Sequence, residues 1–303
     1  MATTYALTKK HADDHLRCLP LDWTVLRPSL VYGKGSYGGT STLRGLAGLP
    51  LITPLIGDGS QPFRPLHIDD FVETVARVIE SDRFARQTLE PVGPERLTMR
   101  EIIANYRQWL GLPPGREISL PLPLMRLFAR LADLGGGGPM GSAGLAQLLA
   151  GNAGREADGV FAAAIGLRPE PMAVRLSRSP AETQDLWHAR LYFLRPLLRF
   201  ALAALWFGSA LAGLLAPPAL YARIASPLTA WIFCAIDLLI ALALLARWRP
   251  GLLATLQLAM VGGYTIGIGF VTPSLWLDPF GALLKNLPIL AAIALWAVLE
   301  QER

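Results

Sequence analysis

Hydrophobic and polar positions are distributed differently in the two parts of this chain. Charged residues are frequent up to about Arg199 and rare beyond it. The later part contains apolar stretches separated by proline or arginine, at residues 197–216, 228–246, 251–271 and 280–299. A helix of about 20 residues, rising about 1.5 Å per residue, crosses a hydrocarbon core of about 30 Å. The pattern therefore predicts an all-α bundle of four transmembrane helices.

The earlier part of the chain shows shorter, alternating patterns. Residues 3–18 have a helical pattern, and residues 23–32 (WTVLRPSLVY) are β-branched and aromatic, as in a buried strand. The segments that begin at Asp70 and Thr98 each open with a capping-box pattern followed by apolar residues at helical spacing. Alternating helices and strands predict an α/β fold with a parallel sheet.

Composition agrees with a chain that folds in two solvents. It has 303 residues, of which 52% are hydrophobic and 17% charged, and its mean hydropathy is +0.38. These values are too apolar for one ordinary soluble domain. The net charge of +5 is modest, and no basic groove with interleaved aromatic residues is found. We therefore expect a lipid bilayer as a partner and no nucleic acid.

Basic residues also predict an orientation. Arginines cluster just before the first apolar stretch, at Arg175, Arg178, Arg190, Arg195 and Arg199. Arg247 and Arg249 lie between the second and third stretches, whereas the loop after the first carries only Arg223. By the positive-inside rule, both termini and the soluble part face the cytoplasm. We expect a multi-pass protein of the inner or plasma membrane without a signal peptide, because charged residues follow Met1 closely.

One carboxylate falls inside an apolar stretch. Asp237 would cost a few kcal/mol in the membrane unless it is paired or faces a polar cavity. Lys285, Tyr264 and Thr265 are the candidate partners, and we assign Asp237 and Lys285 to a membrane polar site. A buried structural hydrogen bond and a ligand or proton site are both open interpretations.

Tyr5 and Lys9 are the candidate catalytic residues. At positions i and i+4 they share one helix face, where an ammonium group stabilises a phenolate and lowers the pKa of the tyrosine. Such a pair can act as a general acid and base. The same spacing also occurs on ordinary solvated helix faces, so its context decides.

That context is a series of ordered motifs. They are YALTK (5–9), WTVLRPSLVYG (23–33), IGDGS (56–60), PLHIDD (65–70) and VGP (92–94). Together they resemble an extended short-chain dehydrogenase/reductase of the NAD-dependent epimerase/dehydratase type, from the first residue to about residue 171. From about residue 187, and especially at 276–281, the chain resembles the DoxX-like membrane domain that some of these dehydrogenases carry at their C-terminus.

The resemblance implies a division into domains. Residues 1–115 would be the C-terminal half of a Rossmann-type domain, residues 116–190 substrate-lobe helices and a juxtamembrane linker, and residues 191–303 the DoxX-like domain. The family's glycine-rich fingerprint, its ribose-reading residue and its catalytic serine precede the tyrosine, and only four residues precede Tyr5 here. We therefore expect that this chain lacks the nucleotide-binding half. It should then be inactive and bind NAD or NADP poorly.

The resemblance also implies roles for single residues. Tyr5 would exchange a proton with the substrate, and Lys9 would assist it, both holding the nicotinamide ribose. Arg27, Pro28 and Ser29 would lie beside the nicotinamide, with the backbone after Pro28 reaching the carboxamide.

A second glycine pattern and two polar side chains remain. Residues 33–38 fit G-x-G-x-x-G, but too short a helix follows for a dinucleotide loop. Arg64 and His67 are candidate contacts to a small carbonyl or sugar-like substrate. His67 with the following aspartates could suggest a metal site, but a helix cap explains the spacing more simply, so no metal is predicted.

Three functions remain open. The first is a membrane-anchored NAD(P)-dependent oxidoreductase or epimerase. The second is a non-enzymatic membrane subunit or assembly protein with a degenerate dehydrogenase lobe, whose truncated sheet a partner chain covers. The third is a quinone-linked redox component of the membrane, suggested by Asp237.

Overall fold

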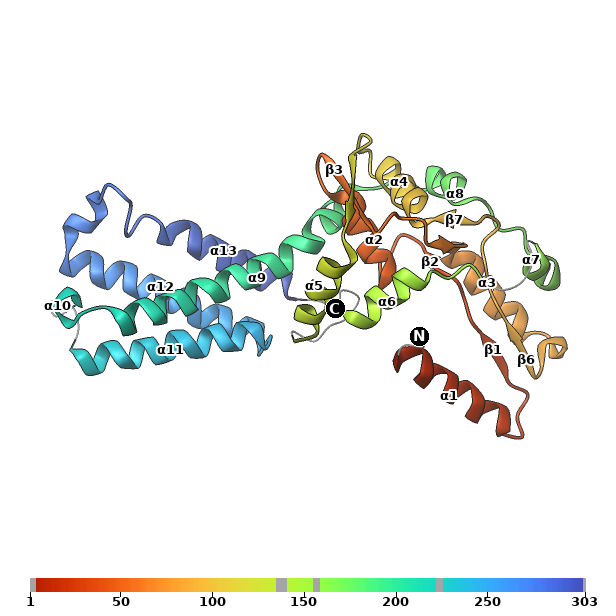
Figure 1. The fold of residues 1–303 in the computed structure, drawn as a ribbon, viewed down its shortest axis with the longest axis horizontal. Helices are drawn as coiled ribbons and strands as arrows, with labels where there is room; N and C mark the ends of the chain where they lie inside the picture. The colour runs from red at the N-terminus through yellow and green to blue at the C-terminus, as the bar shows by residue number, and fades with distance from the viewer. Residues whose placement is uncertain (1–3, 135–140, 155–158, 222–225, 302–303) are drawn as a thin grey trace. The chain divides into compact units, whose positions relative to one another are not determined.

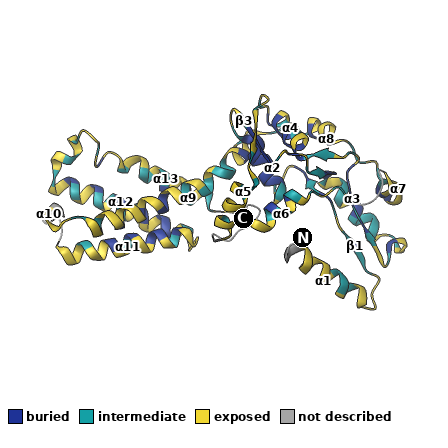
Figure 2. Cartoon of the chain, viewed as in Figure 1, coloured by how far each residue is buried: buried dark blue, intermediate teal, exposed yellow. Residues whose placement is uncertain are grey.

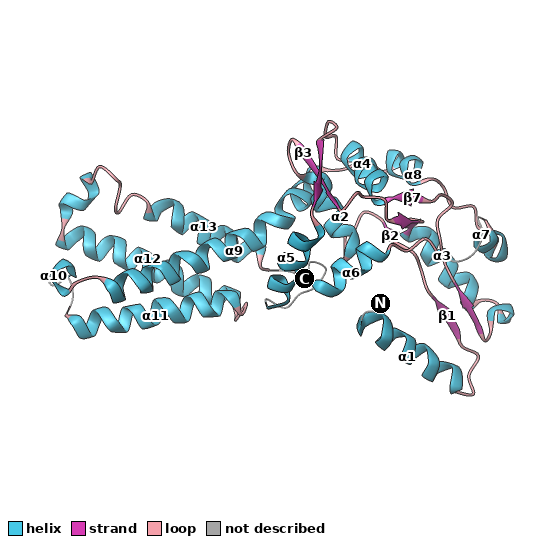
Figure 3. Ribbon diagram, viewed as in Figure 1, coloured by secondary structure: helices cyan, strands magenta, loops and turns pink. Residues whose placement is uncertain are grey.

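The computed structural model describes residues 4–134, 141–154, 159–221 and 226–301. The chain divides into two compact units, Met1–Tyr192 and Phe193–Arg303 (Figure 1). The first unit mixes helices with short strands, whereas the described elements of the second are helical (Figure 3). The predicted limits of 1–115, 116–190 and 191–303 stay predictions.

Helices and short strands alternate along the first unit. Its helices are α1 (Thr4–Cys18), α2 (Gly39–Gly48), α3 (Ile68–Ile79), α4 (Met99–Trp109), α5 (Leu122–Leu134), α6 (Ser142–Ala150), α7 (Val160–Ile165) and α8 (Met172–Arg178), with the 3-10 turn η1 (Asp82–Phe84). Its strands are β1 (Thr24–Leu26), β2 (Val31–Tyr32), β3 (Ile52–Ile56), β4 (Pro62–Phe63), β5 (Leu66–His67), β6 (Gln87–Leu89), β7 (Leu97–Thr98) and β8 (Arg116–Leu120). The mixed α/β character and the predicted helix over residues 3–18 are confirmed.

The strands correct the expectation of one parallel sheet. The described strands form two-stranded ladders: β1–β6, β2–β5 and β3–β8 are parallel, and β4–β7 is antiparallel. Prolines account for part of this fragmentation. Pro28 lies between β1 and β2, and Pro65 lies between β4 and β5. Proline has no N–H to donate, so neither position can contribute a donor to a ladder.

Two helix starts test the capping patterns. At α4 the Thr98 hydroxyl accepts a hydrogen bond from the Glu101 N–H at 3.2 Å, and the Glu101 carboxylate accepts from the Thr98 N–H at 2.7 Å, which confirms that capping box. At α3 the predicted cap at Asp70 is wrong. His67 caps this helix through Nδ1, which accepts from the Asp69 N–H at 3.2 Å. The helix therefore begins earlier, and its two aspartates lie in the first turn, where the helix dipole favours them.

Helices α2 and α4 pack together in the first unit, with Ile102, Ile103 and Tyr106 of α4 fully buried. The buried Arg107 guanidinium donates to the carbonyl oxygens of Ala47 at 2.9 Å and Leu49 at 2.7 Å. These carbonyls belong to the C-terminal end of α2, where helical partners are missing. Arg107 therefore both ends α2 and joins it to α4.

The second unit is built from long apolar helices. Helix α9 (Thr183–Leu215) begins in the first unit and continues into the second, which also contains α10 (Pro218–Tyr221), α11 (Pro227–Leu245), α12 (Pro250–Val271), the 3-10 turn η3 (Pro273–Leu277) and α13 (Asn286–Leu299). Of these, α9, α11 and α12 are long and apolar enough to cross a membrane.

The fourth apolar stretch forms a shorter helix than we predicted. Helix α13 has 14 residues and starts at Asn286, not near residue 280. At about 1.5 Å per residue it extends for about 21 Å, which is less than a hydrocarbon core of about 30 Å. The reason is local, since Pro279 and Gly281, which has a φ of 68°, place the preceding residues in turns. Among the described helices, three are thus long and apolar enough to cross a membrane, and α13 is shorter.

Burial in the second unit fits a lipid solvent. Only 28% of the residues in the apolar windows of α9, α11 and α12 are buried, and many positions along these helices are exposed (Figure 2). Large apolar side chains are among the exposed residues. Its core consists mainly of aliphatic side chains around Trp206 and Trp296. Exposed apolar surface on this scale is unfavourable in water and favourable in a bilayer.

Replacing Thr98 with alanine tests the α4 capping box. The N–H and hydroxyl groups of Thr98 donate to Glu101 and lower the pKa of its carboxyl group. The contribution is therefore present above the unfolded pKa and disappears as pH falls through the folded pKa. We expect Thr98→Ala to lower the free energy of unfolding by about 1 kcal/mol at pH 7. It should also weaken the loss of stability on acidification below about pH 5.

The measurement is the thermal unfolding midpoint of the detergent-solubilised chain between pH 7 and pH 3. Thr98→Ser keeps both hydrogen bonds and serves as the control. An equal loss of stability in Thr98→Ser and Thr98→Ala would show that the methyl group, not the capping box, is responsible.

Candidate functional site

Helix α1 carries the predicted catalytic pair near its N-terminal end. Tyr5 and Lys9 lie one turn apart in this helix. The Tyr5 side chain lies outside the described residues, and Lys9 is exposed. Every described position of α1 is exposed or half-buried (Figure 2). The helix is thus confirmed, while the acid/base role of the pair stays a prediction.

Polar contacts fasten α1 to the strands that follow it. Arg27, which follows β1, donates to one Asp13 carboxylate oxygen from Nε at 3.0 Å and from Nη2 at 2.7 Å. Arg17 donates to the Thr88 hydroxyl of β6 at 2.9 Å. Ion pairs at a surface contribute little, typically below about 1 kcal/mol. These polar contacts therefore stabilise the position of α1, which carries the candidate catalytic pair, less than a buried helix face would.

The segment after β1 continues its main-chain pairing past the proline. The Arg27 N–H donates to the Leu89 carbonyl and the Ser29 N–H to the Pro91 carbonyl, both at 2.9 Å. The Pro28 carbonyl accepts from the Asn152 side-chain amide at 3.0 Å. The main-chain groups nearest the predicted nicotinamide contact are thus already hydrogen-bonded within the chain. The proposed contacts of Arg27, Pro28 and Ser29 to a cofactor stay predictions.

Ser29, Arg64 and Gly93 form the most connected part of the site, which we call the Ser29–Arg64–Gly93 network. The Arg64 N–H donates to the Ser29 hydroxyl at 3.2 Å, and Arg64 Nε donates to the Gly93 carbonyl at 3.2 Å. The Gly93 N–H returns a bond to the Arg64 carbonyl at 3.0 Å. Arg64 is only 3% exposed. This side chain therefore has a framework role, and its contact to a substrate stays a prediction.

Gly93 is required by close approach. A Cβ added there would lie 1.8 Å from the Pro65 carbonyl oxygen, so no other residue fits without moving the backbone. The network thus joins three of the motif segments that are separate in sequence, those around residues 29, 64 and 93. The sequence shows the glycine of the VGP motif, but it does not show that Pro65 approaches this glycine in space.

His67 acts as a helix cap. Its ring meets Tyr32 edge-on with 5.2 Å between centroids, and its Nδ1 accepts from the first turn of α3. Burial, and then the positive charge of Arg175, lower the pKa of the imidazole. A neutral ring is the form that can accept at Nδ1, so the cap and the lowered pKa agree. The cap interpretation of this motif is confirmed, and contact of His67 with a substrate stays a prediction.

The glycine pattern at residues 33–38 does not form a dinucleotide loop. The buried Arg44 of α2 donates to the Lys34 carbonyl at 3.0 Å and also to the Gly33 carbonyl. A phosphate-binding loop presents N–H groups, whereas here carbonyls face a guanidinium. The flanking strands β2 and β3 also belong to different ladders, so no βαβ unit encloses the loop.

Two residues of the site, Arg44 and Asn152, were not predicted from the sequence. Arg44 lies in an apolar helix and is only 1% exposed, stacked on Trp109 at 4.6 Å. Asn152 comes from a segment far along the chain and bonds to Pro28, Ser29 and Arg64. An arginine inside the run TLRGLAG was a usable signal for Arg44. For Asn152 the sequence carries no comparable signal.

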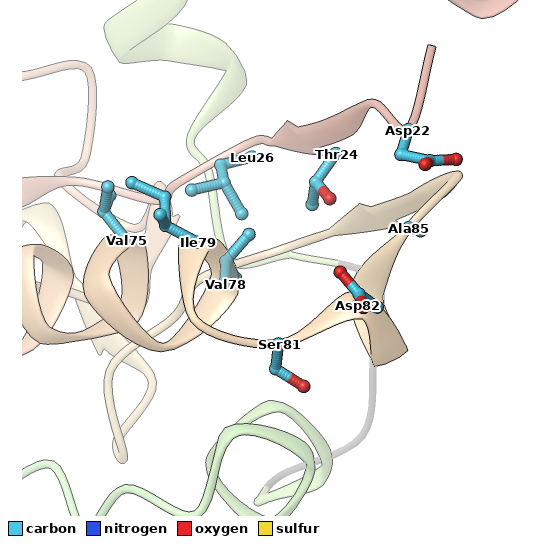
Figure 4. A pocket seen from close by; sticks show the side chains of 9 residues that line it. All are labelled: Asp22, Thr24, Leu26, Val75, Val78, Ile79, Ser81, Asp82 and Ala85. Atoms are coloured by element: carbon cyan, nitrogen blue, oxygen red, sulfur yellow. The ribbon is translucent and has the colours of Figure 1, made fainter. Parts of the chain in front are cut away.

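A hollow of about 350 Å³ lies between β1 and the C-terminal half of α3 (Figure 4). It is lined by apolar side chains with polar residues at one end: Asp22, Thr24, Leu26, Val75, Val78, Ile79, Ser81, Asp82 and Ala85. None of the predicted site residues lines it. Its side chains offer contact area and few groups suited to catalysis, which is more typical of a contact surface than of an active site.

In the second unit, Asp237 has a different partner from the one we predicted. Asp237 is 5% exposed, and its Oδ2 accepts from the Ser209 hydroxyl of α9 at 2.7 Å. Lys285 lies exposed at the N-terminal end of α13 and does not pair with it. The correction has a geometric reason: Ser209 lies on a helix that packs against α11 at the same depth, whereas Lys285 lies before the start of its helix. The other carboxylate oxygen of Asp237 has no hydrogen-bond partner.

The apolar helices of the second unit match the model of a known family. Residues 201–294 match the model of the DoxX-like family. The DoxX-like segment thus covers most of the second unit, as the sequence resemblance implied. No curated protein sequence matches the chain.

The first unit is similar to solved structures of epimerases and a dehydratase. A UDP-glucuronic acid 4-epimerase from Bacillus cereus, with UDP-glucuronic acid and NAD, is 16% identical at a TM-score of 0.42, covering 61% of this chain and 53% of that one. A dTDP-glucose 4,6-dehydratase from Streptomyces venezuelae, with NAD, is 19% identical at 0.37, covering 57% and 50%. A human epimerase family protein, with NADPH, is 22% identical at 0.40, covering 57% and 53%.

This chain therefore spans about half the length of these structures. At such identities and TM-scores the likeness adds no evidence on substrate, cofactor or activity.

Gly93→Ala tests the Ser29–Arg64–Gly93 network. Because the new Cβ meets the Pro65 carbonyl, the two segments must separate, and we expect the free energy of unfolding of the first unit to fall by at least about 3 kcal/mol. The measurement is the rate of limited proteolysis of the first unit in detergent, together with the unfolding midpoint. Gly39→Ala is the matched control, since its Cβ would make only ordinary contacts with Leu148 at 3.8 Å and Leu30 at 3.9 Å. Equal behaviour of both variants would contradict the close approach at Gly93.

Proposed function

We propose that this chain is the C-terminal part of a membrane-anchored NAD(P)-dependent oxidoreductase or epimerase of the short-chain dehydrogenase type. The Ser29–Arg64–Gly93 network carries the proposal, because it joins three motif segments of that family into one framework. The ion pair between Arg27 and Asp13 fastens the helix with the Tyr5 and Lys9 pair to the same framework.

The nucleotide site is the part that this chain does not form by itself. The residues of the 33–38 loop do not fit a dinucleotide, because Arg44 occupies its carbonyls. The phosphate-binding half is therefore supplied by further sequence or by a second chain. In the assembled enzyme Tyr5 exchanges a proton with an oxygen of a small carbonyl or sugar-like substrate, and the Lys9 ammonium favours the phenolate form.

The DoxX-like segment anchors the enzyme to the bilayer. Three helices long and apolar enough to cross a membrane support this role, as does the lipid-compatible exposure of their side chains. The arginines before α9 and in the α11–α12 loop favour a cytoplasmic soluble unit and cytoplasmic termini in the inner or plasma membrane.

An apolar surface supports a non-enzymatic alternative. On α3 the side chains of Val72 and Ile79 are 59% and 78% exposed, and Ile79 also lines the hollow beside β1. Exposed apolar side chains grouped on one face favour a protein contact. The same surface could contact either the nucleotide-binding half of the proposed enzyme or a partner protein in an assembly. A measurement of enzymatic activity therefore distinguishes the two proposals.

Tyr5→Phe is the test of the enzymatic proposal. In the enzyme assembled with its nucleotide-binding half, loss of the phenolic proton should lower kcat by about 10² to 10⁴. The measurement is the absorbance change of NAD(P)H with membranes containing the variant. Tyr37→Phe is the control, because Tyr37 is 83% exposed in a loop outside α1. An unchanged rate in Tyr5→Phe would favour the assembly role.

The same proposal is checked with the 303-residue chain alone. Titration with NADH or NADPH should give no saturable quenching of tryptophan fluorescence in the micromolar range. Saturable micromolar quenching would contradict the need for a second half.

A second candidate function belongs to the DoxX-like segment. One Asp237 carboxylate oxygen and the Tyr264 hydroxyl are buried without hydrogen-bond partners, and Tyr264 lies 5.5 Å from the Phe233 ring between centroids. Buried polar atoms without partners in a membrane helix favour a ligand or proton site. We propose a quinone or another small redox molecule as the ligand.

Asp237→Asn tests this candidate. If the carboxylate exchanges protons with a quinone, the variant should lose at least tenfold in quinone reduction by membranes, while its unfolding midpoint changes little. Thr265→Val is the control, because the Thr265 hydroxyl bonds to Val261 and Asn286 and not to Asp237. An unchanged rate in Asp237→Asn would leave the Ser209 bond as a purely structural contact.

A further inference from the structure

A buried carboxylate collects several arginines in the second unit. Glu300 follows α13, and its side chain is only 1% exposed. Arg195 and Arg199, one turn apart on α9, reach it at 3.5 and 3.6 Å, and Arg247 of the α11–α12 loop reaches it at 3.2 Å. The ends of three helical segments are therefore joined through one carboxylate.

Among the described residues, the charges that meet at Glu300 do not balance. Arg199 and Arg247 address the same Glu300 carboxylate, so these two guanidinium groups alone bring one positive charge more than it neutralises. Arg199 is 8% exposed, and among the described residues both its Nε and the Glu300 Oε1 that faces it are buried without a hydrogen-bond partner. A buried N–H of a charged group that lacks an acceptor is costly. The guanidinium groups therefore carry more positive charge than this one carboxylate neutralises, and that excess favours a further anion.

The cluster is open to the outside at Arg247 and lies at the ends of apolar helices. The Arg247 side chain is 42% exposed, and its loop joins α11 and α12, both long and apolar enough to cross a membrane. Trp248 beside it is 51% exposed, and tryptophan is enriched at the level of lipid headgroups. The backbone at Arg247 is left-handed, with a φ of 53°, an unfavourable conformation for a non-glycine residue. The loop thus holds Arg247 towards Glu300 at some conformational cost.

We propose that Arg199, Arg247 and Glu300 form a binding site for an anionic phosphate group at the membrane surface. Guanidinium groups bind phosphate oxygens through paired hydrogen bonds, which suits this ligand better than a halide or a neutral headgroup. Glu300 acts as an internal anion that keeps the arginines together when the site is empty. The phosphate belongs either to an anionic phospholipid or to a soluble molecule. This inference does not depend on the proposed enzymatic function.

The test uses the whole chain purified in an uncharged detergent. The apparent Kd is measured from the rise of the unfolding midpoint with three probes: short-chain phosphatidylglycerol, short-chain phosphatidylcholine and inorganic phosphate at constant ionic strength. We expect saturable stabilisation by phosphatidylglycerol, by inorganic phosphate or by both, and none by phosphatidylcholine. Stabilisation by phosphatidylglycerol alone identifies a lipid site, and stabilisation by phosphate identifies a site open to soluble ligands.

Variants separate a built site from general charge attraction. Arg247→Gln should weaken binding about tenfold, whereas Arg249→Gln, which removes the same charge from the same loop without touching Glu300, should weaken it less than twofold. Arg247→Lys keeps the charge but loses the planar fork, so it should lie between these values. Glu300→Gln should bind more tightly than the unchanged chain, because the competing carboxylate is gone.

Equal losses in Arg247→Gln and Arg249→Gln would overturn the proposal. So would equal stabilisation by phosphatidylcholine, or weaker binding in Glu300→Gln when its unfolding midpoint is intact. If Arg247→Gln does not fold, the comparison of Arg247→Lys with Arg249→Gln decides, since both remove no buried group.

Discussion

Guanidinium groups buried against main-chain carbonyls hold the loops of the first unit in place. Its strands have two to five residues and pair two by two, so many carbonyls have no ladder partner. Arg44, Arg64 and Arg107, each at most 4% exposed, donate to several of them. A guanidinium offers five N–H donors in a fixed plane, so one side chain can satisfy carbonyls from different segments. Arg64 joins the loops near Ser29 and Gly93 in this way, and Arg107 joins α2 to α4.

The framework contrasts with the helix that carries the candidate chemistry. Strand β1 and the segment to Ser29 are fixed by main-chain bonds, whereas α1 is attached by an ion pair at Asp13 and a hydrogen bond from Arg17. The described positions of α1 have no buried side chain. A catalytic pair requires a held geometry, so the function of Tyr5 and Lys9 depends on what covers this helix. The enzymatic and assembly proposals differ in the partner expected to contact α1: the nucleotide-binding half of an enzyme in one, another protein in the other. Both use the same framework of the first unit.

In the second unit, buried polar side chains contact one another between helices, whereas in the first unit buried arginines contact main-chain carbonyls. The outer surface of the second unit is apolar, and its polar side chains face inward, where Gln257 accepts from Trp206 at 2.8 Å and Thr265 accepts from Asn286 at 2.8 Å. Where hydrocarbon replaces water outside, polar contacts between helices give a bundle its specificity. Several charged side chains, Arg195, Arg199, Arg247 and Glu300, gather at helix ends. Asp237 is the exception, and its half-satisfied carboxylate is the reason that the interior of the bundle is a candidate site.

Local patterns in the sequence determined much of this protein. Apolar runs of about 20 residues predicted the long helices, and the Thr98 box predicted the start of α4, because such signals lie within a few residues of one another. Residues from about 187, and especially 276–281, also indicated the DoxX-like segment. Partner choice was decided only by tertiary structure. His67 caps α3 in place of Asp70, and Ser209 rather than Lys285 binds Asp237, because the partner of a buried polar group depends on which distant segments pack at the same depth. No spacing in the sequence records that packing.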